Sequence, residues 1–119
     1  MRLDEIVRIL GAEVISKGER DDIEVAMGCG SDLMSDVLSS AKPGALLLTG
    51  LTTLQVIYTA ELVDIKVVCF VRGRKPPKET VRLAASKGIV LLLTALPMFE
   101  SCGRLYTNGL AGCSEYAGR

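Results

Sequence analysis

The sequence predicts an α/β protein in which helices cover both faces of a mainly parallel sheet, giving three layers in the order α/β/α. Three short aliphatic runs carry this prediction, residues 45–49, 66–71 and 89–93. An unbroken apolar run between turn residues is typical of a strand covered on both faces, although periodicity alone leaves a buried helix open. A segment with helical spacing follows each run, and this alternation indicates parallel strands joined by right-handed crossovers.

The chain is expected to open with a short helix over residues 3–10. Its apolar residues share one helical face, and Gly11 suits a left-handed helix end. Two β-prone pieces follow, residues 12–16 and 23–27, around a turn-like segment at residues 17–22. The sequence leaves open whether the two pieces pair.

A glycine-rich loop, residues 28–32, precedes the second predicted helix. Such a loop can bind phosphate through free amides, but Asp32 and Asp36 already bring negative charge to the first turn of this helix. We therefore interpret Ser31 or Asp32 as the helix cap. The residues expected on the buried side of the helix are Leu33, Met34, Val37, Leu38 and Ala41.

The predicted helix over residues 52–63, capped by Thr52 or Thr53, is apolar around most of its circumference. Its apolar stripe consists of Leu54, Ile57, Tyr58 and Leu62. A helix with so much apolar surface is covered on two sides. In a domain this small, a second copy of the chain would supply the outer cover, so we predict a homodimer.

Two prolines, Pro76 and Pro77, favour a helix start ahead of residues 78–87, and Gly88 suits its end. The last predicted helix covers residues 97–107.

The length of 119 residues suits one domain, which we place at residues 1–110. Residues 111–119, rich in glycine and alanine, are expected to be a flexible C-terminal tail.

Composition narrows the function classes. The chain has 14 Lys and Arg against 14 Asp and Glu, and no histidine. Balanced charge argues against nucleic-acid and membrane-surface binding, because both rely on excess positive charge. The absence of histidine removes the commonest general base and the commonest metal ligand.

No membrane segment or signal peptide is predicted. The longest apolar stretch, residues 88–99, contains Pro97 and is too short to span a bilayer. Acidic residues Asp4 and Glu5 stand where a signal peptide is apolar. A cytoplasmic location follows as the default.

The four cysteines contain no Cys-x-x-Cys pair and are expected to be free thiols. Cys69 lies inside an aliphatic run and is expected in the core. Cys29, Cys102 and Cys113 sit beside glycine or serine and could converge on iron or zinc, but their spacing does not require it. No metal or cofactor is predicted.

A candidate binding site follows from the sheet, because ligands of open parallel sheets bind beyond the carboxyl ends of the strands. These ends are the threonine loop (residues 49–53), the basic loop (residues 72–75) and residues 94–96. The first supplies hydroxyls and helix amides, with no acidic side chain before Glu61, and the second supplies three positive charges. Together they would form a rim that suits a small anion or a nucleotide. The candidate ligand-binding residues are Thr49, Gly50, Thr52, Thr53, Arg72, Gly73, Arg74 and Thr94.

The plainer alternative is that the basic loop is a solvated turn and the threonines cap a helix. The sequence has no Walker lysine pattern and no complete Gly-x-Gly-x-x-Gly. No catalytic residue is predicted, because the acidic pairs are ordinary for exposed surfaces and a serine or cysteine nucleophile lacks a histidine base. We expect a protein that is not an enzyme.

Four stretches resemble a stand-alone DRTGG domain protein: GSDLMSDVL (30–38), LTGLTTLQ (48–55), VRGRKPP (71–77) and MFESCGRLY (98–106). The resemblance extends over about residues 3–110. The family is named after an Asp-Arg pair and a Thr-Gly-Gly triplet. This sequence departs from both, with Thr-Gly-Leu-Thr at the place of the pair and Arg-Gly-Arg at the place of the triplet.

The resemblance implies a three-layer fold like the amino-terminal domain of HPr kinase/phosphorylase, an accessory role and a tendency to dimerise. Similar domains occur fused to CBS domains in regulated pyrophosphatases and in some phosphotransacetylases. Stand-alone versions occur beside iron-hydrogenase and NADH-oxidising subunits in anaerobes. This context implies a regulatory or assembly partner of a redox complex.

These observations together predict a homodimeric regulatory module that senses a small anion or nucleotide. The alternative is an interaction module that docks on a hydrogenase-type redox complex through its apolar helix and binds no small molecule.

Overall fold

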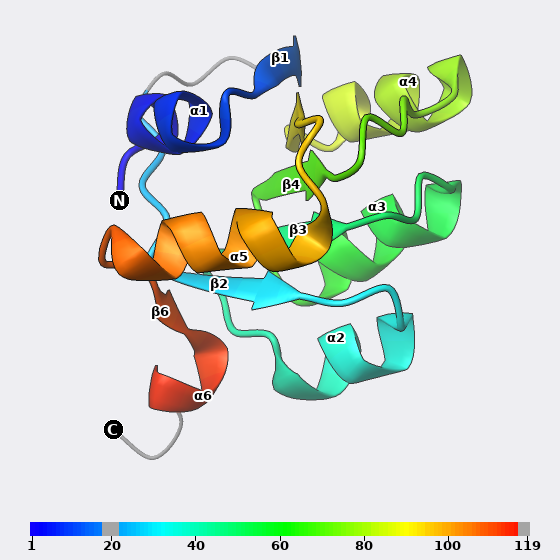
Figure 1. The fold of residues 1–119 in the computed structure, drawn as a ribbon. Coiled ribbons are helices and arrows are strands. Elements are labelled where there is room, and N and C mark those ends of the chain that lie inside the picture. The colour runs from blue at the N-terminus through cyan, green and yellow to red at the C-terminus, as the bar shows by residue number, and fades with distance from the viewer. Residues whose placement is uncertain (18–21, 117–119) are drawn as a thin grey trace.

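The computed structural model describes residues 1–17 and 22–116, with side chains up to Ser114. Its core is a six-stranded mixed sheet with the strand order β1-β5-β4-β3-β2-β6 (Figure 1). The strands are β1 (Glu13–Ser16), β2 (Met27–Gly30), β3 (Ala45–Thr49), β4 (Val67–Phe70), β5 (Val90–Leu93) and β6 (Ala111–Gly112). From β5 to β6 the neighbouring strands are parallel, and β1 pairs antiparallel with β5 at one edge. The predicted mainly parallel sheet is confirmed.

Helices cover both faces of the sheet, which confirms the predicted three layers (Figure 1). One face carries α1 (Leu3–Leu10) and α5 (Met98–Thr107), and the other carries α2 (Met34–Ser40), α3 (Leu54–Leu62) and α4 (Lys78–Ser86). Alternate residues of the central strands enter two cores. In β3, Leu46 and Leu48 pack with α1 and α5, and Leu47 packs with the other three helices. Over the described residues, none of the helices has the length and apolar character needed to cross a membrane.

The two β-prone pieces near the start of the chain do not pair with each other. The first piece contains β1, which joins the sheet through β5. In the second piece Glu24 forms an isolated bridge with Arg2, and only Met27 belongs to a strand, β2, which lies on the far side of β3. The segment that we predicted as a glycine-rich loop is strand β2 itself, because its glycines serve close packing rather than a turn. A Cβ on Gly30 would lie 2.8 Å from the Cys102 sulfur of α5. The predicted turn at residues 17–22 lies largely outside the described residues.

Helix α2 differs from the prediction in its N-cap and in which of its residues are buried. It begins after Leu33, whose amide donates to the Ser31 hydroxyl oxygen at 3.0 Å, and no side chain caps it. Met34 and Val37 are buried as predicted, but Leu33 and Leu38 are 57% and 47% exposed. The predicted cap Asp32 turns toward β3 instead.

The end of the chain carries structure where a flexible tail was predicted. Residues 111–112 form β6, which pairs in parallel with β2, and α6 (Cys113–Tyr116) follows. The pairing fits the small residues on both sides, because Gly28 stands opposite Gly112. The flexibility of residues 111–119 and the single domain stay predictions.

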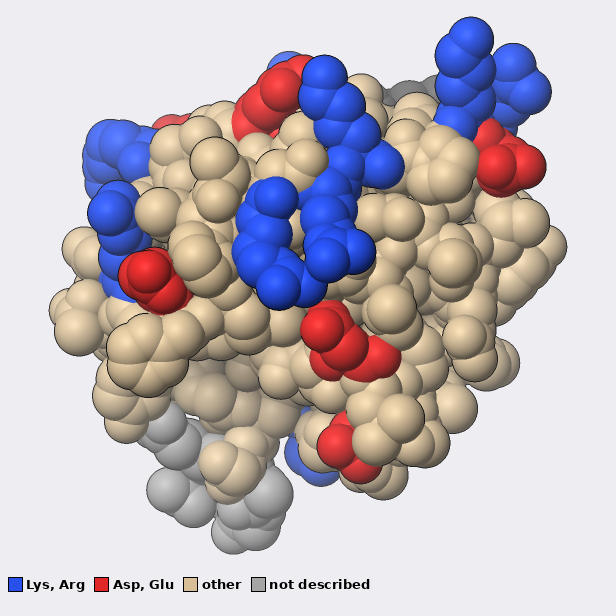
Figure 2. Space-filling view, turned by 45° about the vertical axis from the view of Figure 1, so that its right-hand side comes forward, with Lys and Arg blue, Asp and Glu red and all other residues tan. Residues whose placement is uncertain are grey.

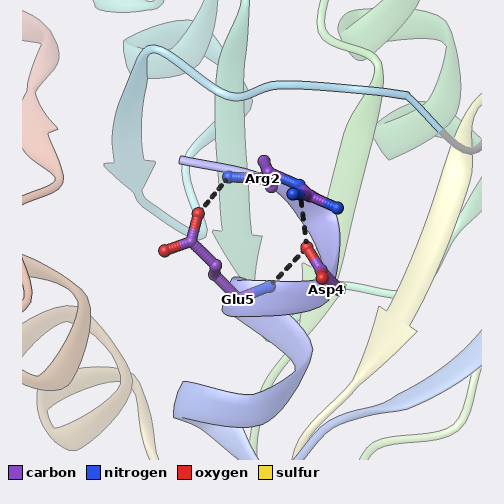
Figure 3. Close-up of polar contacts among 3 residues, drawn as sticks. All are labelled: Arg2, Asp4 and Glu5. Carbon is purple, nitrogen blue, oxygen red and sulfur yellow. Dashed lines mark hydrogen bonds and ion pairs between the residues drawn. The ribbon is translucent and has the colours of Figure 1, made fainter.

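Helix α1 begins and ends as its sequence predicts. The Arg2 amide donates to Glu5 Oε1 at 3.0 Å, and the Glu5 amide donates to Asp4 Oδ1 at 3.1 Å (Figure 3). Arg2 Nε lies 3.4 Å from the same Asp4 oxygen. Gly11 closes the helix with φ of 57°. This helix packs on α5 and covers the sheet beneath it.

Candidate functional site

The exits of β3, β4 and β5 meet at one edge of the sheet, as the sequence predicted. The Val71 amide donates to the Thr49 carbonyl at 3.0 Å, and the Gly73 amide donates to the Thr94 carbonyl at 2.8 Å. The three strands are parallel neighbours, so their carboxyl ends necessarily lie together. The threonine loop, the basic loop and residues 94–96 therefore form one continuous rim.

A carboxylate from a fourth exit joins this rim. Asp32 follows β2, and its Oδ1 accepts hydrogen bonds from the Gly50 amide at 2.6 Å and from the Thr49 hydroxyl at 3.0 Å. Thr49 Oγ1 in turn accepts a bond from the Leu51 amide at 3.2 Å. The first turn of α3 has no acidic residue, as the sequence indicated, but the Gly50 amide ahead of that helix does meet a negative charge. An acidic side chain distant in sequence reaches it.

Asp32 is the residue of this edge that the sequence analysis assigned to another role. A signal was available, because Asp32 stands two residues after a strand that neighbours β3. Reading residues 27–30 as a strand would have placed Asp32 at a strand exit beside the threonine loop. The glycines concealed that strand.

The start of α3 lies open beside the rim. Thr53 occupies the N-cap position without a side-chain hydrogen bond, and the first turn of α3 contains no acidic residue. Thr52 is half-buried, and its carbonyl accepts a 2.8 Å hydrogen bond from the Thr80 hydroxyl. That bond ties the threonine loop to α4. The amides of the α3 N-terminus carry the positive end of the helix dipole toward solvent.

The basic loop begins with a strained residue. Arg72 adopts a left-handed φ of 59°, followed by Gly73 at 66°. A residue with a Cβ pays roughly 1–2 kcal/mol for this conformation. The Arg72 amide donates to the Leu96 carbonyl at 2.9 Å, so the backbone of the turn is fixed to the neighbouring exit.

The Arg72 and Asp32 side chains both approach Gly50. A Cβ built on Gly50 would lie 3.4 Å from Asp32 Oδ1 and 3.7 Å from Arg72 Nη2. Gly50 therefore leaves the space through which a carboxylate and a guanidinium approach the same backbone position. A larger residue here would push against both groups.

Positive charge gathers around this point. Arg72, Arg74 and Lys75 are exposed, and within the described part of the chain none of them forms an ion pair. Figure 2 shows basic side chains at the centre of the face toward which the strands point, with acidic side chains directly below. An anion arriving at this face meets cations that no ion pair among the described residues neutralises.

Thr94 belongs to the framework rather than to the exposed rim. It is 1% exposed, and its hydroxyl donates to the Leu10 carbonyl at 2.8 Å and accepts from the Leu96 amide at 3.2 Å. Thr49 is also fully buried, with its hydroxyl used as described above. The exposed members of the predicted set are Thr53, Arg72, Gly73 and Arg74.

The cysteines divide between the two faces of the sheet. Cys69 is buried as predicted, and burial raises its pKa to about 12. Cys102 packs on the α5 side, whereas Cys29 and Cys113 share the core beneath α2 and α3. Burial raises the pKa of Cys29 and of Cys102. Across residues 1–17 and 22–116, no three His, Cys, Asp or Glu side chains gather where a metal ion could be held.

A separate apolar pocket lies between α5 and the β2 edge, and no sequence pattern pointed to it. It has a volume of about 320 Å³, with Gly28 and Gly30 of β2 in its wall. Phe99 and Tyr106 border it and are 86% and 62% exposed. The pocket forms because its wall contains glycines, Gly28 and Gly30 on β2 and Gly103 on α5, which have no side chains to fill the space.

Comparison with known proteins supports the fold. No protein-family model matches the sequence, and no curated protein matches it. Among solved structures, the chain is similar to the CBS and DRTGG domains of the regulatory region of Clostridium perfringens pyrophosphatase, crystallised with its activator diadenosine tetraphosphate. The TM-score is 0.73 at 18% identity, covering 87% of this chain and 45% of that chain. The chain thus shares its fold with part of an enzyme's regulatory region.

Proposed function

We propose that this chain is a non-catalytic, cytoplasmic regulatory module of the DRTGG type that binds a small phosphorylated anion or a nucleotide at the carboxyl edge of its sheet. The observation that carries the proposal is the basic loop. Its three cations are exposed and have no ion pair within the described residues, and Arg72 approaches Gly50 in the loop that leads into α3. Guanidinium groups and helix amides are the donors that proteins use for phosphate oxygens.

The backbone of Arg72 supports a functional role for its side chain. Strained residues cluster at ligand-binding sites, where the surrounding structure holds them in place. A glycine at position 72 would remove the strain at φ of 59°, but it would also remove the guanidinium beside Gly50. The chain keeps the guanidinium in spite of the strain.

The structural neighbour supports the class of ligand. Its regulatory region was crystallised with diadenosine tetraphosphate, a dinucleotide with four phosphates. Because this chain spans less than half of that neighbour, we take from it a regulatory role and a phosphorylated ligand, not a particular nucleotide.

The side chains that could act as bases or nucleophiles support a catalytic role less well than a binding role. The chain has no histidine. Burial raises the pKa of the Cys29 and Cys102 thiols, so both stay protonated at neutral pH and are weak nucleophiles. The Asp32 carboxylate is engaged by backbone and hydroxyl donors rather than aimed at an open space.

Thermal-shift measurements test the proposal, with diadenosine tetraphosphate, AMP and pyrophosphate each at millimolar concentration. A ligand at one hundred times its Kd stabilises the native state by about 2.7 kcal/mol, which is about 10 °C in a domain of this size. We expect R72Q and R74Q to lose the shift. K66Q is the matched control, because Lys66 lies at the amino end of β4, away from the carboxyl ends that form the rim, and pairs with Asp64. A shift that persists in both arginine variants, or no shift with any probe, would count against the site.

A second candidate function rests on the outer face of α2 and α3. These helices contact each other and carry exposed apolar side chains. The residues are Leu33, Leu38, Leu54, Tyr58 and Leu62, with Leu62 75% exposed. Such a face suits a homodimer interface or docking on a redox enzyme of the hydrogenase type.

Light scattering separates these partners. A homodimer through this face should give twice the monomer mass at micromolar concentration and should dissociate in L62E. A monomeric wild-type chain would contradict the homodimer. Co-purification with a hydrogenase-type complex from the native host, lost in L62E, would then favour the docking role.

A further inference from the structure

Two cysteines meet where the last strand joins the sheet. β2 and β6 run in parallel with Gly28 opposite Gly112. Cys29 and Cys113 directly follow this pair, Cys113 as the first residue of α6, and their side chains are within hydrogen-bonding reach of each other. Neighbouring strands lie about 4.8 Å apart. This spacing falls within the Cα separation of roughly 4.4–6.8 Å that a disulfide bridges.

Both thiols also point to the same face of the sheet. Cys29 and Cys113 belong to the core beneath α2, which includes the buried Met34. Gly28 faces the opposite way, because a Cβ there would meet Leu110. Side chains alternate along a strand, so Cys29 is directed away from the α5 side on which the Cys102 thiol packs.

The surroundings of Cys29 reflect its neighbour. The pKa of the Cys29 thiol is raised, and burial is the largest cause. The adjacent Cys113 raises this pKa further, whereas a hydrogen bond with Ser40 lowers it. Cys113 is 7% exposed and Cys29 is half-buried. Cys29 is therefore a thiol at neutral pH, it lies close to Cys113, and it is the more accessible of the two.

We propose that Cys29 and Cys113 are an oxidation site that closes into an intramolecular disulfide and fastens β6 and α6 to the sheet. Strand β6 has two residues and, in the described structure, pairs only with β2. The bond would close a loop of roughly 80 residues, and a loop of that length strongly restricts the unfolded chain. Ala111 and Gly112 also line the apolar pocket, so the bond would fix one wall of that pocket.

Hydrogen peroxide is the oxidant class that we invoke. The Cys29 thiolate attacks one peroxide oxygen, the O–O bond breaks, and sulfenic acid and water form. The Cys113 sulfur then attacks the sulfenic sulfur, the S–S bond forms, and the hydroxyl leaves with the thiol proton as a second water. Two thiols and one peroxide thus give one disulfide and two waters. Because the pKa of Cys29 is raised, little thiolate is present at neutral pH, so the first step is slow there and becomes faster as pH rises.

Oxidation of the purified, reduced full chain with hydrogen peroxide tests the site. We expect an intact mass lower by about 2 Da, and Cys69 and Cys102 still open to alkylation after unfolding. Trypsin places Cys29, Cys102 and Cys113 in separate peptides, so the linked pair can be read directly. C102S should form the same bond, and neither C29S nor C113S should form it. A bond to Cys102, a covalent dimer on a non-reducing gel, or four alkylated thiols would overturn the proposal.

The melting temperature tests whether the Cys29–Cys113 disulfide stabilises the attachment of β6 and α6 to the sheet. Oxidised wild-type and oxidised C102S should melt about 10 °C above their reduced forms, because a disulfide of this kind is worth several kcal/mol. Peroxide should leave the melting temperature of C29S and C113S unchanged. Circular dichroism of each reduced variant establishes that it is folded. A linked wild-type chain with an unchanged melting temperature would overturn the fastening role.

Discussion

Replacing Asp32 with alanine should destabilise the fold more than its exposed position suggests. The variant D32A removes the acceptor for the buried Gly50 amide at 2.6 Å and for the Thr49 hydroxyl at 3.0 Å. Hydrogen bonds to charged groups contribute about 1.5–3 kcal/mol each, and water can replace part of this at an exposed carboxylate. We therefore expect a loss of about 2 kcal/mol for the two bonds together.

Urea unfolding measures this loss. With a slope m of about 2 kcal/mol/M, the midpoint should fall by about 1 M and the slope should stay unchanged. D36A is the matched control, because Asp36 is exposed in the first turn of α2, just after Asp32, and engages its neighbours through its backbone carbonyl. D32N, which keeps the acceptor oxygen, should fall between the two. A midpoint for D32A no lower than that of D36A would refute the bridge between the β2 and β3 exits.

Three further predictions follow. The variant G30A should lower the free energy of unfolding by about 1–3 kcal/mol, because its Cβ would press on the Cys102 sulfur. The variant G103A, on the open side of α5, should raise that free energy by up to about 1 kcal/mol through helix propensity. Urea unfolding midpoints compare the two variants. The variant R72G should raise the free energy of unfolding by about 0.5–1 kcal/mol, because glycine adopts the left-handed φ without strain. It should also lose the ligand-induced thermal shift. A less stable R72G would show that the arginine side chain supports the fold instead. Stability should also fall as pH rises from about 9 toward 12, because the unfolded chain ionises Cys69 near 9.0 whereas burial holds its folded pKa at about 12. The loss approaches about 1.4 kcal/mol per pH unit and should flatten in C69A, as melting temperatures between pH 8 and 10.5 would show.

The central part of the fold was predictable because its signal is local. The three aliphatic runs are buried along β3, β4 and β5, and such burial leaves no polar residue to interrupt them. Parallel pairing then forces Thr49, Arg72 and Thr94 to one edge whatever their side chains do. The location of the rim therefore followed from strand identity alone.

The edges of the sheet were not predictable from local pattern. Glycine favours turns, yet Gly28 and Gly30 lie in β2, because Leu110 packs closely over Gly28 and helix α5, about 70 residues later, leaves no room for a Cβ on Gly30. The sequence also showed no sign of a strand at residues 111–112, because β6 needs only two small residues to pair with β2. In both places the deciding contact is remote in sequence.

Side-chain roles at the rim were open to the same error. Asp32 matches the local preference for a helix cap, but the Gly50 amide is a stronger partner than the first turn of α2. Thr94 matches the pattern of an exposed hydroxyl after a strand, but it is needed by the Leu10 carbonyl at the end of α1. Hydroxyls and carboxylates take the nearest unsatisfied backbone group, and only the tertiary structure shows which group that is.

These internal contacts narrow where an anion would bind. The Gly50 amide and the Thr49 hydroxyl already face the Asp32 carboxylate, so a phosphate there would meet negative charge and occupied donors. The Arg72 guanidinium also approaches Gly50 and belongs to the exposed basic loop, and the first turn of α3 contains no acidic residue. Phosphate oxygens should therefore engage the basic loop side of the rim, with Asp32 setting the limit of the site rather than forming part of it.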